Sequence, residues 1–215
     1  MRKKLIILGT SGFSREIAML AEQVNSHLHC WEILGHVGNP PPEPNISNLR
    51  YLGDDDWLMN QKIEIDLAIG IGKPEIKEKV LRKYLAIPDL FSFPNLFHPS
   101  VSMDYNKIEF GKGNVAAAGC RFTCDISIGD FNLFNLNATI GHDVSIGNYN
   151  VINPGVNISG GTKISNCVLL GTGSQILENL TVEDNATIGA GSVVTKSVGK
   201  GQIMIGIPAR PFEKP

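Results

Sequence analysis

The chain has 215 residues, a formal net charge of −2 and 19% charged residues. This length allows one large domain or two small ones, and without a basic run the chain is not expected to bind nucleic acid. The apolar runs are all too short for a transmembrane helix, so no membrane insertion is predicted.

The first forty residues predict the opening of a nucleotide-binding α/β fold. Residues 3–9 form a short apolar run, too short for a signal peptide, and predict a buried strand. A small polar turn at 9–14 precedes helical spacing over 14–25, with Ser14 as the expected N-cap. Backbone N–H groups at such a helix start suit a phosphate. The glycine spacing is GxxG and not GxGxxG, so a dinucleotide site is not predicted.

The remainder of the first hundred residues predicts a small parallel sheet. Strands are expected at 30–37 and 66–72, a stiff proline-rich loop at 39–44, and a second helix from Pro74 to about Leu85. A final strand is expected within 93–98. Residues 1–97 are therefore predicted to be a Rossmann-like half-fold with three or four parallel strands that grips one nucleotide.

An unbroken six-residue period begins at Phe110. Every sixth residue from there to Val194 is apolar, fifteen in all, and six of the residues that directly follow are glycine. A hexapeptide period is the repeat length of a parallel β-helix. The apolar residue and the small residue two before it are expected to fill a triangular prism. Positive φ at the following glycine is expected to make the corner.

The prism has consequences for stacking and assembly. Three hexads complete a coil, so fifteen give about five coils, roughly 24 Å at the spacing of neighbouring strands. Residues 18 apart share a face, so Gly160 should stack next to His142, with Gly161 beside it. A smooth prism wall favours a homotrimer with the active sites between two subunits. The segment after Val194 is expected to cap the open end.

The four cysteines, Cys30, Cys120, Cys124 and Cys167, form no CxxC pair. We interpret them as reduced structural thiols of a cytoplasmic protein. No histidine has a partner pattern for a metal site, so no metal is predicted.

Several motifs together resemble one family, the sugar O- and N-acyltransferases of the sialic acid O-acetyltransferase type and of bacillosamine and perosamine synthesis. They are the GxxG turn at 9–12, His-Pro-Ser at 98–100, Thr-Ile-Gly-His-Asp at 139–143, Asn-Pro-Gly at 153–155, Gly-Ala-Gly-Ser-Val-Val-Thr-Lys at 189–196 and Gly-Ile-Pro-Ala-Arg at 206–210. The resemblance covers nearly the whole chain. It implies a left-handed β-helix acetyltransferase domain over 98–215.

The resemblance also implies substrates and roles. The donor would be acetyl-CoA, and the usual acceptor a sugar linked to a nucleotide. His142 would be the general base and Asp143 its polarising neighbour. Further matches are Asn135 for the acceptor amine, Gly9, Ser11 and Gly12 for the nucleotide sugar, and Gly160, Gly161, Ala190 and Lys196 for the cofactor. Residues 37–39, where the family often has paired aspartates, are Val-Gly-Asn here, so the base is not identified.

The chemistry fits these residue types, and simpler interpretations stand beside it. Acyl transfer from a thioester needs a base, and histidine accepts a proton near neutral pH. A lone histidine at a turn could be a surface residue, turns favour aspartate in any case, and Asn135 is one of several corner asparagines. Gly160 and Gly161 could serve only the corner, and Lys196 could be a solvated surface charge.

Three functions remain open at this stage. The first is N-acetylation of a nucleotide-linked 4-amino-4,6-dideoxy sugar, by direct transfer without an acyl-enzyme intermediate. The product would be used in surface-glycan synthesis. The second is O-acetylation of sialic acid or another sugar hydroxyl at the same site. The third is a non-catalytic scaffold or nucleotide-sugar sensor. The presence of the Gly-His-Asp sequence argues against it.

Overall fold

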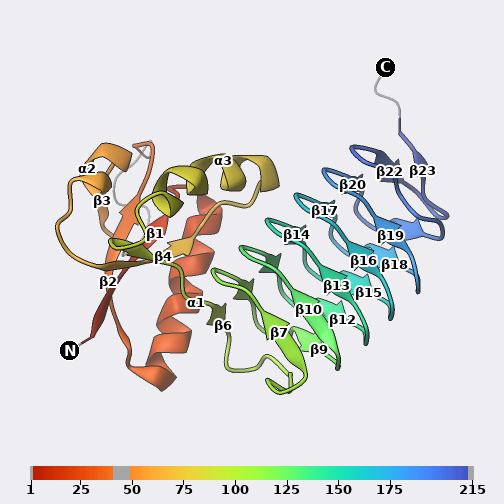
Figure 1. The fold of residues 1–215 in the computed structure, drawn as a ribbon, viewed down its shortest axis with the longest axis horizontal. Coiled ribbons are helices and arrows are strands. Elements are labelled where there is room, and N and C mark those ends of the chain that lie inside the picture. Colours follow the sequence, from red (N-terminus) through yellow and green to blue (C-terminus); the bar gives the residue numbers. More distant parts are fainter. Residues whose placement is uncertain (1, 41–48, 213–215) are drawn as a thin grey trace.

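The computed structural model describes residues 2–40 and 49–212. An α/β unit at the N-terminal end is followed by a triangular prism of stacked coils that runs to the C-terminal end (Figure 1). Most of the proline-rich loop expected at 39–44 lies outside the described residues.

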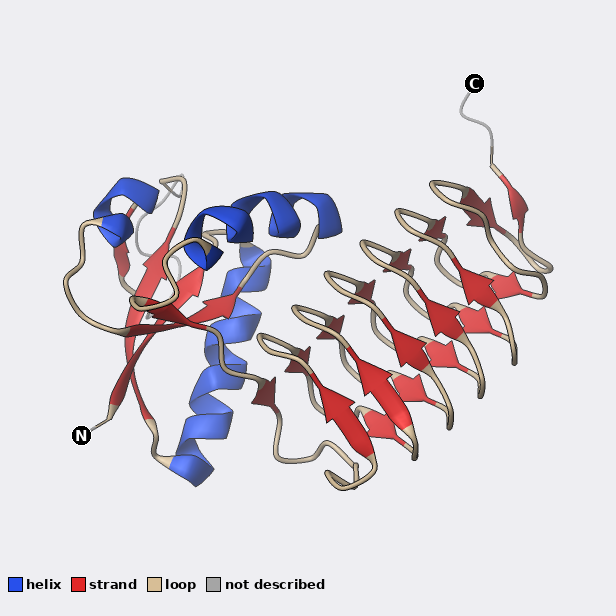
Figure 2. Ribbon diagram, viewed as in Figure 1, coloured by secondary structure: helices blue, strands red, loops and turns tan. Residues whose placement is uncertain are grey.

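The α/β unit is built on a five-stranded parallel sheet of order β3-β2-β1-β4-β5. Figure 2 shows helices on both faces of this sheet. Helix α1 packs on one face through Ile17, Leu20 and Val24, and α2 and α3 pack on the other through Leu58, Leu81 and Tyr84. The elements in chain order are β1 (Lys3–Leu8), α1 (Gly12–Leu28), β2 (Trp31–Val37), β3 (Tyr51–Gly53), α2 (Asp55–Met59), β4 (Ile65–Ile69), α3 (Pro74–Leu85) and β5 (Phe91–Ser92).

The sequence predicted too few strands for this sheet. Three or four strands were expected, and the described residues form five, because β3 and β5 have only three and two residues and carry no alternating pattern. The short helix α2 was also missed. Pairing with neighbouring strands makes such short strands stable, and a local pattern does not reveal that pairing.

The expected N-cap of α1 was wrong by three residues. The helix begins at Gly12 with Ser11 as N-cap, and Ser14 is fully buried, its hydroxyl donating to the Ser11 carbonyl oxygen at 2.5 Å. A Cβ on Gly70 would lie 2.7 Å from Cβ of Ser14. Ser14 is therefore a small residue at a close contact between α1 and the end of β4, and not a cap.

The prism consists of three sheets, one per face, as expected for a left-handed β-helix of hexapeptide repeats. All of their strands pair in parallel except β22 with β23. From β7 to β21 the partners are 18 residues apart, for example Thr139 with Asn157, and the end strands β6 and β22 pair at other spacings. The first face holds β7 (Ile108–Phe110), β10 (Ile126–Ile128), β13 (Ser145–Ile146), β16 (Lys163–Ile164) and β19 (Thr181–Val182). The second holds β6 (Leu96–Phe97), β8 (Val115–Ala116), β11 (Leu133–Phe134), β14 (Val151–Ile152), β17 (Leu169–Leu170), β20 (Thr187–Ile188), β22 (Ile203–Ile205) and β23 (Arg210–Pro211). The third holds β9 (Arg121–Phe122), β12 (Thr139–Ile140), β15 (Asn157–Ile158), β18 (Gln175–Ile176) and β21 (Val193–Val194).

The prism interior is filled as the period predicts. The sixth-residue apolar side chains are almost all buried, and so are the small residues two before them. The sequence placed the strand within 93–98 in the N-terminal sheet, but β6 pairs with β8 and extends a face of the prism.

The corner geometry differs from the expectation. The glycine after each apolar residue does not have positive φ; the left-handed position comes three residues after the apolar one and recurs every six residues. The glycines are needed for another reason, since a Cβ on Gly141 or Gly171 would lie 2.7 or 2.5 Å from a backbone nitrogen of the next coil. Close stacking of coils, and not backbone conformation, excludes a side chain there.

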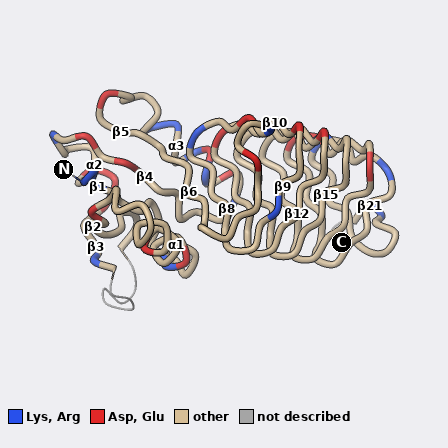
Figure 3. The backbone as a smooth tube through the Cα atoms, turned by 90° about the horizontal axis from the view of Figure 1, so that it is seen from below, with Lys and Arg blue, Asp and Glu red and all other residues tan. Residues whose placement is uncertain are grey.

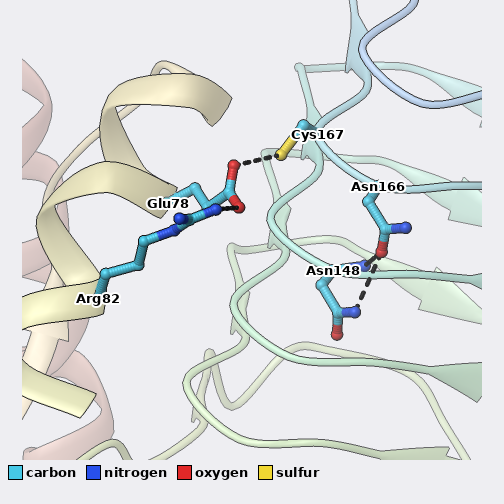
Figure 4. A network of polar contacts seen from close by, with 5 residues as sticks. All are labelled: Glu78, Arg82, Asn148, Asn166 and Cys167. Carbon is cyan, nitrogen blue, oxygen red and sulfur yellow. Dashed lines mark hydrogen bonds and ion pairs between the residues drawn. The ribbon is translucent and has the colours of Figure 1, made fainter. Parts of the chain in front are cut away.

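The α/β unit is docked firmly on the prism. The outward residues Val115, Leu133 and Val151 of the second face are buried against α1. At one corner of the prism, Cys167 Sγ donates to Glu78 of α3 at 3.4 Å, and Glu78 also pairs with Arg82 (Figure 4). Acidic and basic residues are interspersed along the prism (Figure 3).

Candidate active site

The centre of the candidate site is the corner that follows β12. His142 and Asp143 are both exposed there, with 65% and 66% of their side-chain surface accessible. Nδ1 of His142 lies 2.7 Å from Oδ2 of Asp143. This contact orients the ring and favours the proton on Nδ1, which leaves Nε2 as the nitrogen that can accept one.

The backbone fixes both residues. Asp143 has a φ of 59°, and its N–H donates to the carbonyl of Cys124, one coil earlier, at 3.2 Å. The carbonyl of His142 accepts from the N–H of Gly161, one coil later, at 2.9 Å. Aspartate is among the residues that tolerate this left-handed conformation best. The ladder of coils therefore holds the pair in place from both sides.

Gly160 lies directly under the histidine ring, as the 18-residue repeat predicts. A Cβ on Gly160 would be 2.6 Å from Cε1 of His142, and a Cβ on Gly141 would be 2.7 Å from the Gly160 nitrogen. Two glycines thus leave space around the Gly160 N–H and Nε2. The Gly161 N–H is already used in the fold by the His142 carbonyl.

Asn135 lies at a different corner of the same prism. It follows β11, whereas His142 follows β12, so one edge of the triangle separates them. Its Oδ1 accepts from the N–H of Leu136 at 2.8 Å. The corner faces α1 across a mainly apolar groove of about 380 Å³, lined by Asn135, Leu136 and Pro154 from the prism and by Phe13, Ile17 and Met19 from the helix, among others.

A second cavity, also of about 380 Å³, lies at the carboxyl ends of β1, β2 and β4. Open α/β sheets bind their ligands at this edge. Gly9, Thr10 and Ser11 line the cavity at the start of α1, and Gly12 follows as the first helical residue. Gly9 has a φ of 121°, and a Cβ there would lie 2.6 Å from the Gly70 carbonyl oxygen. The turn is shaped so that its backbone borders the cavity.

One residue of this cavity was missed at the sequence level. Asp55 of α2 lines it, and its carboxylate accepts hydrogen bonds from Lys83 and Tyr84 of α3. Burial alone would raise the pKa of Asp55, but the bonds from Lys83 and Tyr84 lower it below the ordinary value. Asp55 is thus ionised at neutral pH. Neither α2 nor a role for Asp55 was predicted from the sequence, because no motif marks this residue.

The two C-terminal cofactor candidates lie further along the prism. Ala190 is exposed at the corner on Asn135's side, and its nitrogen would be 2.5 Å from a Cβ on Gly171. Lys196 is exposed on the His142 side, three coils beyond His142, or about 14 Å at the spacing of adjacent strands. Neither contacts the histidine.

Two further questions are whether the described residues hold the side chains of a metal site and whether a helix among them could span a membrane. Within residues 2–40 and 49–212, no group of three or more His, Cys, Asp and Glu side chains is arranged to hold a metal ion. Across that same part of the chain, no helix combines the length and apolar character needed to span a bilayer. All four cysteines are free thiols, and burial, as the main cause, raises the pKa of Cys120 to about 11 and that of Cys167 to about 12.

Two family models match the chain. Residues 4–84 match the PglD N-terminal domain, and residues 161–196 match the bacterial transferase hexapeptide repeats. Together the two matches cover more than half of the chain. No curated protein sequence matches it.

Several solved structures share the whole fold. The acetyltransferase domain of PglB from Neisseria gonorrhoeae, in complex with acetyl coenzyme A, superposes with a TM-score of 0.89 at 24% identity, over 99% of this chain and 100% of that one. PerB from Caulobacter crescentus, in complex with CoA and GDP-perosamine, gives 0.87 at 24% identity, over 98% and 97%. WeeI from Acinetobacter baumannii gives 0.86 at 24% identity, over 98% and 100%.

The first match lies on the α/β unit that carries the cavity, and the second lies on the coils that follow His142. The likeness in fold extends this agreement from end to end. The chain thus joins a PglD-type N-terminal domain to a β-helix that carries bacterial transferase hexapeptide repeats.

Proposed function

We propose that the protein transfers an acetyl group from acetyl-CoA to the amino group of a nucleotide-linked 4-amino-4,6-dideoxy sugar. The observation that carries the proposal is the His142–Asp143 pair, with Nδ1 bound at 2.7 Å and Nε2 over a glycine. The similar PglB domain and PerB, which hold acetyl-CoA and CoA with GDP-perosamine, support the donor and the acceptor class.

The transfer needs no acyl-enzyme. The acceptor nitrogen attacks the thioester carbonyl carbon while Nε2 of His142 takes a proton from it. Asp143 stabilises the imidazolium that forms. The Gly160 N–H donates to the oxyanion of the tetrahedral intermediate. The C–S bond then breaks, and the imidazolium returns its proton to the leaving CoA thiolate.

The division of labour follows the two parts of the chain. Residues 1–97 hold the nucleotide sugar, with its phosphates at the turn formed by Gly9, Ser11 and Gly12. Residues 98–215 hold acetyl-CoA and carry the base. We place the reaction in the cytoplasm, in keeping with four reduced thiols.

We further propose a homotrimer with its active sites between subunits. Asn135 and His142 lie at different corners of one prism, so an acceptor amine that contacts both must sit between two copies. The same pairing would bring Ala190 of one copy and Lys196 of the next to one CoA molecule. Mixed trimers test this arrangement. Inactive Asn135→Ala and His142→Ala chains, co-assembled, should regain part of the activity, whereas no regain contradicts shared sites.

The first experiment is thiol release from acetyl-CoA across an acceptor panel. The panel holds UDP-, GDP- and dTDP-linked 4-amino-4,6-dideoxy sugars, free sialic acid and CMP-sialic acid. Activity on an amino sugar supports the proposal, and activity only on sialic acid moves it to O-acetylation. If no acceptor in the panel gives thiol release, the proposal is contradicted. If the protein also fails to bind acetyl-CoA, a sensor or scaffold function is favoured.

Variants of the base complete the test. His142→Ala should lower turnover by about 100-fold or more, the usual contribution of a general base. The matched control is His27→Ala, an exposed histidine on α1 whose loss should leave turnover unchanged. Unchanged turnover in His142→Ala would contradict the assignment of the base.

A further inference from the structure

The cavity at the carboxyl ends of β1, β2 and β4, called the nucleotide cavity below, has two chemically different ends. At one end lie Thr10 and Ser11, at the start of α1, together with Lys73, just before α3 begins. The cavity continues along α3 past Ile76 to Val80, about 10 Å further at the rise of a helix. Asp55 also lines it and is bound to Lys83 and Tyr84, near the end of α3. The carboxylate therefore lies at the end remote from the start of α1.

The middle of the cavity is suited to a flat ring. Val37, the last residue of β2, and Gly38 after it border one side, and Ile71, Ile76 and Val80 border it from the β4–α3 side. Ile76 is 48% exposed, so its side chain offers the cavity an apolar surface for a ligand to contact. With phosphates at the α1 end, an aromatic base fits between these apolar side chains and reaches Asp55.

Asp55 is held in one orientation and in one ionisation state. Lys83 donates to one carboxylate oxygen and Tyr84 to the other. The side chain nevertheless remains 39% exposed, so lone pairs are left for a ligand. An ionised carboxylate only accepts hydrogen bonds, and it can accept two from neighbouring donors.

The nucleobases differ in what they offer to such an acceptor. Guanine presents two adjacent donors, N1–H and N2–H₂, on one edge. Uracil and thymine present a single N3–H flanked by two carbonyl oxygens, which a carboxylate repels. Cytosine and adenine each present an amino group next to a ring nitrogen that is itself an acceptor. Two adjacent donors match the two oxygens of one carboxylate.

We infer that Asp55 binds the N1–H and N2–H₂ edge of guanine, so that the sugar acceptor is carried by GDP. This inference rests on the proposed function for the presence of a nucleotide sugar and adds the identity of the base. Lys83 and Tyr84 are positioning residues that keep the carboxylate turned toward the cavity. Asn39, which also lines the cavity, lies where the resemblance left the base unidentified.

Binding of free nucleoside diphosphates tests the inference directly. Calorimetric titration of the full chain with GDP, UDP, dTDP, CDP and ADP should give GDP at least a tenfold lower Kd than the others. Asp55→Asn should weaken GDP binding at least tenfold and change UDP binding less than threefold. Asp56→Asn is the matched control, since Asp56 lies on the same helix, is exposed and does not line the cavity.

The other outcomes overturn the inference. Equal weakening of all five ligands by Asp55→Asn would mean that the carboxylate binds the ribose hydroxyls, and equal binding by the unaltered chain would mean that the base is not read. If Asp55→Asn does not fold, Asp55→Glu keeps the charge but shifts it by one methylene, and should reduce the GDP preference. A preserved preference would again contradict the inference.

Failure here and failure of the proposed function can be told apart. Nucleotide binding needs neither acetyl-CoA nor the base, so His142→Ala should keep the full GDP preference. Acetyl transfer to a UDP- or dTDP-linked amino sugar would refute the role of Asp55 and leave the proposed reaction intact. GDP preference without acetyl transfer to any acceptor would refute the reaction alone.

Discussion

A Cβ atom on Gly160 would lie 2.6 Å from Cε1 and 2.7 Å from Nε2 of His142. These distances are well below any real contact, so the histidine ring occupies the place of the missing side chain. Gly160 therefore has two functions in the proposed site, as the surface on which the ring rests and as a backbone donor. The 18-residue repeat brings the two residues together.

Gly160→Ala should displace the His142 ring and lower kcat by about 100-fold, while thermal stability changes little because both residues are at the surface. The measurement is steady-state acetyl transfer together with Tm. The matched control is Gly199→Ala, where the new Cβ would come no closer than 3.4 Å to a flexible glutamine. Wild-type turnover in Gly160→Ala would show that the ring does not need this space.

Asp143→Asn should lower kcat by about tenfold, on the order of 1.4 kcal/mol in the barrier. Asparagine tolerates the left-handed backbone and can still accept from Nδ1, so the change removes the charge and little else. Asp125→Asn is the control, because Asp125 has a φ of 57° one coil earlier and lies beside Lys107 rather than a histidine. Equal effects of the two variants would argue against a specific role for Asp143.

Lys77 should make the stability depend on pH in an unusual window. Its amine is buried between α3 and the prism, donates to the Asn150 carbonyl at 3.1 Å, and has its pKa lowered to about 7 by burial. Between pH 7 and about 10.5 the unfolded chain binds a proton that the folded chain lacks, so the free energy of unfolding should rise with pH across this window.

Lys77→Met should flatten that rise and raise the free energy of unfolding at pH 7 by about 1–4 kcal/mol, the range seen when buried ionic groups become apolar. The Asn150 carbonyl keeps its bond from the Leu133 N–H. Urea unfolding at pH 6.5, 8 and 9.5 measures the effect, with the exposed Lys79→Met as control. A slope that survives in Lys77→Met would have to arise from another group.

Phe131→Ala should cost about 3–5 kcal/mol of stability, the usual loss for a buried phenylalanine. Phe131 occupies a left-handed corner position of the prism, yet it is 1% exposed and packs against Phe93 and Tyr149. Chemical denaturation measures the loss. Tyr105→Ala, at a position 68% exposed, should cost less than about 0.5 kcal/mol. If Phe131→Ala also costs less than about 0.5 kcal/mol, Phe131 does not contribute to the packing of the α/β unit on the prism.

The prism and the proposed base could be predicted from the sequence because they depend on a local repeat. Fifteen apolar residues at one spacing specify three faces and an interior, and the same spacing predicts that Gly160 stacks on His142. The helix from Pro74 to Leu85 was also predicted from its local pattern. The corner glycines show the limit of this reasoning. Their contacts lie on the next coil, so the sequence suggested a backbone conformation where the actual cause is close approach.

Only the tertiary structure decided the contacts between segments that share no repeat. Strands β3 and β5 exist because their neighbours pair with them, and Asp55 faces the cavity because α2 packs near the end of α3. The docking of α1 on Val115, Leu133 and Val151 had a signal in the sequence, an apolar outward position repeated on one face, but its partner was not identifiable from spacing. Local repetition determines how a coil stacks on its own neighbour, whereas the position of a separate unit depends on packing between surfaces far apart in the chain.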